Sequence, residues 1–298
     1  MKDFCGLVSI VGRPNVGKST LLNRLIEQKI SITSRKSQTT RNNILGIKTK
    51  ENHQMVFIDT PGVHINASKV MNKVLNQSAL GAIEDADLII FMLQRNKINT
   101  LDELILERLK GIKTKKLCVI NKLDQVASIN SLLPVIEKLR SEHDFAEIIP
   151  VSAKTGKNIN ELENMICQNL PENNHLYDSD TKFLAKESFM ISEIIREKII
   201  RFLGEELPHE TYVQLQKLED KENIINIDAE IIVARESQKG IVVGKNGAKL
   251  KKIGEKARID LEKFFNKKVF LKTWVKTKKN WNNDSDFISS LGIGSLYD

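Results

Sequence analysis

The first half of the chain alternates short apolar runs with longer stretches in which apolar residues recur at helical spacing. The short runs are rich in β-branched residues and are bounded by turn residues, which predicts buried strands over 7–11, 55–58, 87–93, 116–120 and 148–151. The longer stretches predict helices that begin after Lys18 and that span 69–83, 101–109, 129–140 and 159–170. Strands and helices in alternation predict a doubly wound α/β sheet.

One strand departs from this alternation. Residues 43–50 form a further strand-like run, which a polar turn at 51–53 joins to the strand that begins at residue 55. Two runs separated by so short a turn predict an antiparallel hairpin. The first sheet is therefore expected to be mixed but mostly parallel.

The pattern changes after Pro171. Residues 173–182 are polar and aperiodic, which indicates a linker between a first domain over 1–172 and a second over 183–298. The second domain begins with a helix that carries isoleucines on one face. Two strands over 212–218 and 224–233, two helical stretches around a glycine turn, and a strand over 269–275 follow. This order predicts an α+β unit.

Length and composition agree with two folded domains. The chain has 298 residues, of which 41% are hydrophobic and 28% charged, as in soluble folded proteins. No apolar run reaches the roughly 18 residues that a membrane span needs. The first residues also lack the pattern of a secretory leader. We therefore expect a soluble, cytoplasmic protein.

Cysteine and histidine predict neither a disulfide framework nor a zinc site. The three cysteines, Cys5, Cys118 and Cys167, are odd in number, far apart and placed in apolar segments. The five histidines show no ligand spacing. We expect buried thiols and no metal held by imidazole.

The net charge of +8 is concentrated in one segment. Residues 239–279 contain fourteen Lys and Arg against three acids, a local excess of eleven. Such a field attracts polyanions, either nucleic acid or an anionic lipid surface. The alternative is a solvated helix face without a partner.

A phosphate-binding loop follows the first strand. Residues 12–19 fit GxxxxGK[ST] and lie between an apolar strand and a helix, where this motif closes backbone N–H groups around phosphate. Lys18 would supply a charge to the phosphates, and the Ser19 hydroxyl would bind Mg²⁺. The expected binding residues are Gly12, Arg13, Pro14, Asn15, Val16, Gly17, Lys18, Ser19 and Thr20. ATPases and small-molecule kinases share this loop, so it does not identify the base.

A second motif points to guanine. Asn121, Lys122 and Asp124 form NKxD directly after a strand, at the edge where open α/β sheets bind ligands. One carboxylate can accept the N1–H and the N2 amine of guanine together, and adenine offers neither donor there. After the next strand, backbone N–H groups of Ser152, Ala153 and Lys154 would face guanine O6, although this segment is also consistent with an ordinary loop.

Two loops have the composition of nucleotide-dependent switches. Asp59, Thr60, Pro61 and Gly62 form DxxG at the end of a strand, so that Asp59 would hold Mg²⁺ through water and the Gly62 N–H would sense the γ-phosphate. In the polar loop over 37–41, Thr40, or alternatively Thr39, would reach Mg²⁺ only when the γ-phosphate is present.

For hydrolysis, Lys18, Asn15, Thr40 and Gly62 are the expected catalytic residues, with Ser19, Thr40 and Asp59 at the metal. In Ras a glutamine orients the attacking water. Here Val63 follows Gly62 and cannot do so, which predicts slow intrinsic turnover. Asn15 either holds a potassium ion beside the phosphates or only shapes the loop.

The basic segment contains a GxxG turn between two helical stretches. In the KH module such a turn clamps a single-stranded RNA backbone. The expected RNA-binding residues are Gly244, Lys245, Asn246, Gly247, Lys249 and Lys252, with Ile241, Val242 and Val243 lining the groove. Lysines resting on anionic lipid are the alternative. Trp274 and Trp281 are expected to pack rather than to stack on bases.

The segments GRPNVGKS, QTTR, DTPG, NKLD and SAK, followed by GKNGAKLKKIG, closely resemble the bacterial Era GTPases along nearly the whole chain. The resemblance implies a Ras-like domain followed by a type II KH domain, with GTP, GDP and Mg²⁺ as ligands. It further implies GTP hydrolysis, binding of the 3′ end of 16S ribosomal RNA, and a role in 30S subunit assembly and rRNA maturation. A monomer that associates loosely with the inner membrane is also implied. The residues after Trp281 depart most from this family's pattern.

Overall fold

The computed structural model describes residues 2–33, 44–62, 70–203 and 210–291. Its larger sheet has the strand order β6-β5-β4-β1-β3-β2-β7. Pairings between β1 and β3, β1 and β4, β4 and β5, and β5 and β6 are parallel. The strands are β1 (Phe4–Val11), β2 (Ile44–Lys50), β3 (His53–Asp59), β4 (Leu88–Gln94), β5 (Lys115–Asn121), β6 (Glu147–Pro150) and β7 (Phe183–Leu184). The expected doubly wound sheet is confirmed.

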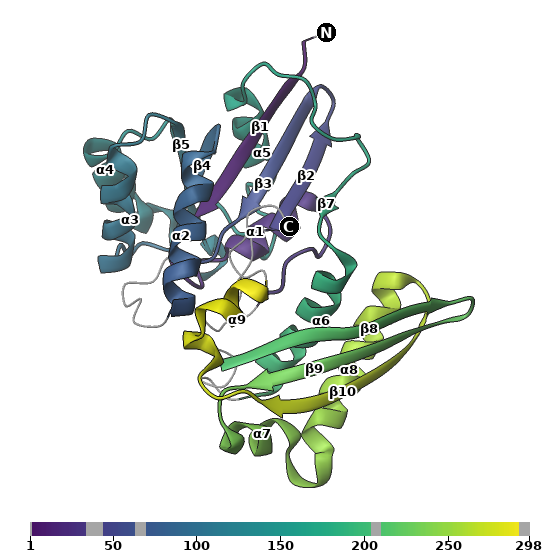
Figure 1. Ribbon diagram of the computed structural model, residues 1–298. Helices are drawn as coiled ribbons and strands as arrows, with labels where there is room; N and C mark the ends of the chain where they lie inside the picture. Colours follow the sequence, from purple (N-terminus) through teal and green to yellow (C-terminus); the bar gives the residue numbers. More distant parts are fainter. Residues whose placement is uncertain (1, 34–43, 63–69, 204–209, 292–298) are drawn as a thin grey trace.

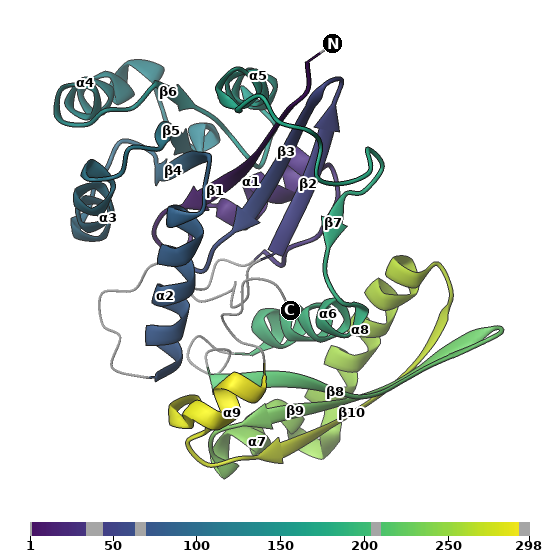
Figure 2. The ribbon, with the colours of Figure 1, turned by 45° about the horizontal axis from the view of Figure 1, so that its top comes forward.

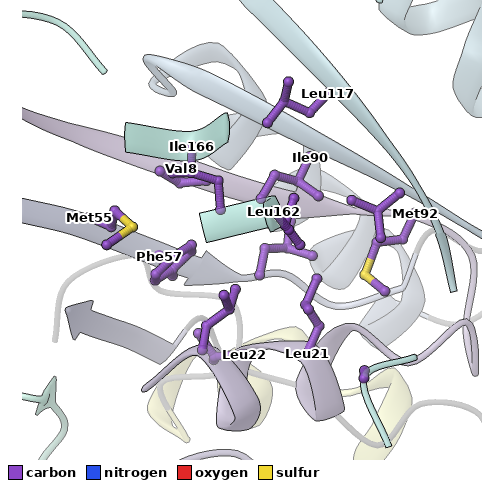
Figure 3. Close-up of a cluster of buried hydrophobic side chains, with 14 of the residues drawn as sticks. Val8, Leu21, Leu22, Met55, Phe57, Ile90, Met92, Leu117, Leu162 and Ile166 are labelled. Atoms are coloured by element: carbon purple, nitrogen blue, oxygen red, sulfur yellow. The ribbon is translucent and has the colours of Figure 1, made fainter. Parts of the chain in front are cut away.

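Helices cover both faces of this sheet (Figure 1). They are α1 (Lys18–Ile26), α2 (Val70–Glu84), α3 (Thr100–Lys110), α4 (Leu133–Glu142) and α5 (Ile159–Asn169). Figure 3 shows the core on the side of α1 and α5, where Leu21, Leu22 and Leu162 pack against strand residues such as Val8 and Phe57. On the opposite face α2, α3 and α4 pack against a second cluster. Because a buried layer of side chains packs on each face of the sheet, the ends of its strands are held in fixed positions along one edge.

The edge of the larger sheet differs from the expected plan. The predicted hairpin of β2 and β3 is present and antiparallel. The sheet then continues with β7, whose residues 183 and 184 had been assigned to the second domain and instead pair with β2. The preceding segment is also attached, because Gln54 accepts the N–H groups of Leu176 and Tyr177 at 2.8 and 3.0 Å. A two-residue strand has no periodicity of its own, so the pattern could not reveal it.

The second domain is a three-stranded sheet under three helices, with strand order β10-β9-β8. β9 is parallel to β10 and antiparallel to β8. The elements are α6 (Glu187–Phe202), β8 (Thr211–Lys221), β9 (Ile224–Val233), α7 (Glu236–Val243), α8 (Ala248–Phe265) and β10 (Lys268–Thr277). Inward-facing strand residues and α6, α7 and α8 share one core. The predicted α+β unit is confirmed.

The chain then returns to the first domain. The 3₁₀ helix η5 (Trp281–Asn283) and helix α9 (Ser285–Ser290) lie against the first half of α2, between the two sheets (Figures 1 and 2). Trp281 is fully buried there with Met71, Leu75 and Ile288, which confirms its expected packing role. Lys29, in the loop after α1, also contacts Glu197 of α6 at 2.6 Å. Both contacts join the two domains. On the first domain they lie at Lys29, before the predicted switch loop over 37–41, and at α2, after the predicted switch loop that contains DxxG.

Candidate nucleotide and nucleic-acid sites

The four nucleotide motifs meet at one edge of the larger sheet. The loop over 12–17 follows β1, DxxG begins at the end of β3, NKxD begins at the end of β5, and residues 152–154 follow β6. Because these strands are parallel, their carboxyl ends lie side by side, where open α/β sheets bind ligands. Topology therefore brings together segments that span more than half of the first domain.

Lys18 is held inside the phosphate-binding loop. Its ammonium donates to the carbonyls of Gly12 at 2.9 Å and Arg13 at 3.3 Å, and the residue is 6% exposed. Burial lowers the pKa of Lys18 to about 8, against the opposing effect of the Asp59 carboxylate. A charge so poorly solvated by water gains more from a phosphate than an exposed one would.

The loop also requires glycine for steric reasons. Gly17 has φ of 109°, and a Cβ there would lie 2.3 Å from Nδ2 of Asn121. A Cβ on Gly62 would lie 2.9 Å from the backbone nitrogen of Pro14. Asn121 of the NKxD segment thus packs against Gly17, and Gly62 of the DxxG segment packs against Pro14, so both segments lie directly beside the phosphate-binding loop.

Two of the three expected metal ligands are adjacent. The Ser19 hydroxyl donates to Oδ2 of Asp59 at 2.8 Å, and Ser31 donates to the same oxygen at 2.8 Å. Hydroxyl and carboxylate oxygens are ligands that Mg²⁺ prefers, so the donor set fits that ion. The third expected ligand, Thr40, lies outside the described residues, as do Thr39 and Val63.

The base-recognition end is organised by side chains. Oδ1 of Asp124 accepts the Ser152 hydroxyl at 2.6 Å, and Ser152 is fully buried. Asn121 donates to the Val16 carbonyl at 2.8 Å and accepts the Ala153 N–H at 3.0 Å. The sequence predicts that backbone N–H groups of Ser152, Ala153 and Lys154 face guanine O6. The structure instead directs those of Ser152 and Ala153 to the Lys157 carbonyl and to Asn121.

Asn15 and Lys122 lie together at the rim of the loop. Asn15 has φ of 65°, a conformation that asparagine tolerates better than most residues. Its carbonyl accepts the Lys122 ammonium at 2.7 Å, and Lys122 also donates to Gln94. The other expected nucleotide-binding residues are Arg13, Pro14, Val16, Thr20, Thr60, Pro61 and Lys154. The clearest anchor among them is the buried Thr60 hydroxyl, which donates to the Ile10 carbonyl at 2.8 Å.

Sequence reasoning missed the residues that brace these loops. Arg13 donates to Asp102 at 3.1 Å, and Asp102 is fully buried at the start of α3. Burial raises the pKa of Asp102, against the opposing effects of the Asn99 N–H and the Arg13 charge. Arg24 of α1 donates to the carbonyls of Ala153 and Lys154. No sequence motif identifies Asp102 or Arg24. Only the folded structure, in which α3 and α1 contact the nucleotide-binding loops, reveals them.

The GxxG turn has the backbone geometry of a clamp. It joins α7 to α8 through a 3₁₀ turn, with positive φ at Gly244 (72°), Asn246 (51°) and Gly247 (78°). Lys245, Lys249 and Lys252, the expected RNA-binding lysines, are exposed around it. Ile241 is 44% exposed and available to line the groove, whereas Val242 is fully buried in the core. The expected groove residue Val242 is therefore corrected to a core residue.

Within the described residues, no group of three or more His, Cys, Asp or Glu side chains is placed to hold a metal ion. None of the helices described there is long and apolar enough to cross a membrane.

Comparison with known proteins agrees with both sites. A family described as 50S ribosome-binding GTPase matches residues 7–122, and the KH domain family matches residues 206–282. GTPase Era of Haemophilus influenzae is 46% identical over 292 residues, 98% of this chain and 97% of its own. GTPase Era of Coxiella burnetii is 46% identical over 290 residues, 97% of this chain and 98% of its own.

Solved structures give the same result. A crystal structure of Era in complex with MgGDPNP and nucleotides 1506–1542 of 16S ribosomal RNA has a TM-score of 0.94, with 36% identity over 97% of this chain and 99% of that one. A variant of Aquifex aeolicus Era bound to GDP and AlF4⁻ has a TM-score of 0.94, with 36% identity over 98% and 99%. Sequence, motif geometry and fold agree along nearly the whole chain, which belongs to the Era GTPases.

Proposed function

We propose that this protein binds and hydrolyses GTP, binds the 3′ end of 16S ribosomal RNA through its KH domain, and assists 30S subunit assembly and rRNA maturation. The observation that carries the proposal is the meeting of phosphate loop, metal ligands and Asp124 at one sheet edge, in a chain that also carries an exposed GxxG turn. The RNA target is taken from the similar Era structure with its 16S fragment.

Each expected residue of the nucleotide site has a role that follows from its position in the protein. The backbone of residues 12–17 and the Lys18 ammonium bind the phosphates, and the Gly62 N–H, close to Pro14 of that loop, senses the γ-phosphate. Ser19 and Asp59 hold Mg²⁺, together with Thr40 of the switch loop. The metal supplies charge stabilisation for the transferred phosphoryl group. Asp124, oriented by Ser152, accepts the two guanine donors.

Base selection is the direct test of this assignment. Calorimetric titration of the purified protein should give GTP and GDP dissociation constants at least about a thousandfold below those of ATP and ADP, since a site built to accept hydrogen bonds rejects ligands that lack the donors. Equal binding of ATP would refute the nucleotide assignment.

Potassium acting beside Asn15 is a further part of the proposal. Asn15 is exposed at the loop rim and its backbone is fixed by Lys122, so its side chain is available to a cation near the phosphates. Hydrolysis in potassium should exceed hydrolysis in sodium at equal ionic strength. Equal rates would leave Asn15 with a loop-shaping role only.

The nucleotide and RNA sites are proposed to be coupled, so that the triphosphate state favours RNA. Support comes from two contacts between the domains, Trp281 against α2 and Lys29 against Glu197. Lys29 lies eight residues before the predicted switch loop over 37–41, and Met71 of α2, which packs with Trp281, lies nine residues after Gly62. RNA affinity should be higher with a GTP analogue than with GDP. Identical affinities would mean that the two sites bind independently, since a ligand shifts an equilibrium between two states only if it binds them with different affinities.

Membrane association and a monomeric state stay predictions.

A further inference from the structure

The three-stranded sheet has one face that α6, α7 and α8 do not cover. Inward residues of β10 such as Val269 and Val275 pack under α6, α7 and α8, and Figure 2 shows α6 and α8 on one side of the strands. Because side chains alternate along a strand, the opposite face carries the intervening residues. On β10 these are Lys268, Phe270, Lys272, Trp274 and Lys276.

The two ends of this outer face differ. At one end Tyr212 and Ile232 lie beneath the C-terminal segment with Trp281 and Ile288, and Ile232 is 3% exposed. At the other end Phe270, opposite Asn226 of β9, is 58% exposed, the largest value among the large hydrophobic residues that the structure describes. Residues 281–291 thus pack at the Ile232 end, and among the described residues the phenyl ring of Phe270 stays accessible.

The rest of the strand is held in place. The Trp274 indole donates to Glu230 at 3.0 Å, and the Lys272 ammonium lies 5.9 Å from the centre of the indole ring. Trp274 lies on the same face as Phe270, four residues along the strand, and its indole N–H is already paired. An exposed aromatic ring on a sheet face is suited to stacking, because a base can cover its π-face.

The charge of the face points to a polyanion. β10 contributes three lysines and no acid to this face, whereas the acids of the face are Asp228 and Glu230 of β9 and Glu219 of β8, which lies opposite Asn226 and pairs with Lys217 at 2.8 Å. Glu230 is already engaged by Trp274 and lies 3.7 Å from Lys276. Lysines that alternate with an exposed aromatic ring match the composition of single-strand binding surfaces, where bases stack and the backbone meets positive charge.

The face also adjoins the helices that flank the GxxG turn. β10 is the edge strand of its sheet, and α7 and α8, which flank the GxxG turn, both contact it. An RNA strand leaving the groove reaches the outer face by crossing this one edge. We propose that the outer face of β10, centred on Phe270, is a second contact surface for single-stranded RNA, with a base on the phenyl ring and phosphates near Lys268, Lys272 and Lys276. The proposal rests on the RNA binding proposed above.

The test compares two RNA lengths on the full-length protein. A four-nucleotide RNA fills the length that a GxxG groove clamps, and an RNA of about twelve nucleotides extends beyond it. Phe270→Thr removes the ring but keeps a β-branched strand residue. It should weaken binding of the longer RNA at least about fivefold, the lower end of what stacking one base contributes, and leave the shorter RNA unchanged. Phe270→Tyr should bind like the unmodified protein.

Charge and specificity supply the controls. Lys272→Ala should lower the salt dependence of binding of the longer RNA by about 0.7, the single-strand slope for one phosphate contact. Unchanged affinity of Phe270→Thr for the longer RNA would overturn the second surface. The double variant Lys245→Glu with Lys249→Glu should weaken both RNAs, and if it weakens neither, the proposed RNA function itself fails. Binding to anionic phosphatidylserine vesicles that Phe270→Thr reduces, without an effect on RNA, would assign the face to lipid instead.

Discussion

The nucleotide site and the GxxG turn are both proposed to bind phosphate groups, yet they are built in opposite ways. Lys18 is buried and bonded to loop carbonyls, and Asp124 is oriented by a buried serine. Around the GxxG turn the lysines are exposed, and the positive φ angles of the turn itself shape the backbone. The first site gains strength from restricted solvation, the second from accumulated charge. Single substitutions should therefore have large effects at the first and small ones at the second.

The largest effect is expected at Asp124. Asp124→Asn should weaken GTP and GDP binding about 10²- to 10⁴-fold, because two hydrogen bonds to a charged acceptor contribute about 1.5–3 kcal/mol each. ATP binding should change little. Calorimetry measures all of these constants, with Asp144→Asn, an exposed acid of the same domain, as the matched control. A loss of GTP and GDP affinity of only a few-fold would show that the nucleotide site, like the GxxG turn, does not depend on single side chains.

Lys18→Ala should lower the rate of GTP hydrolysis about 10²- to 10³-fold, the usual effect of removing one preorganised charge or donor from the reacting group. Single-turnover phosphate release measures the rate at saturating GTP. Lys110→Ala, an exposed lysine on α3, serves as the control. A rate within threefold of the unmodified protein, on the order of 1 kcal/mol or less, would contradict the role of Lys18.

The orienting bond from Ser152 should matter less. Ser152→Ala leaves the Asp124 carboxylate in place but removes one 2.6 Å hydrogen bond to it, which contributes about 1.5 kcal/mol. GDP affinity should fall roughly tenfold. In the double variant with Asp124→Asn the two losses should not add, because both substitutions act on one interaction. Additive losses would separate Ser152 from base recognition.

The smallest effects are expected at the GxxG lysines. Lys245→Ala and Lys249→Ala should each weaken RNA binding only a few-fold at physiological salt and lower the salt slope by about 0.7. Filter binding across a salt series measures both quantities, with the exposed Lys138→Ala of the first domain as control. A loss as large as that of Asp124→Asn would indicate a buried, bonded lysine rather than an open charged surface.

The elements that the sequence predicted best carry their signal locally. The strands of the larger sheet, the hairpin of β2 and β3, and the GxxG turn each follow from runs or turn residues within about ten positions. The residues that were missed depend on contacts between distant segments. Asp102 reaches Arg13 across 89 positions, and β7 exists only because residues 183 and 184 meet β2. Val242 was assigned to the groove because its neighbours suggested it, whereas the sheet beneath α7 buries it.

The position of Trp281 in the chain has a consequence for the order of events during synthesis. Every strand of both sheets precedes residue 281, so both domains are complete in sequence before the indole that packs against α2 leaves the ribosome. Domains generally fold as units, with the N-terminal one first. The first domain is therefore translated and can fold before Trp281 packs against α2. The Lys29–Glu197 contact between the domains can form earlier, once residue 197 has left the ribosome, so the tryptophan adds the later of these two contacts.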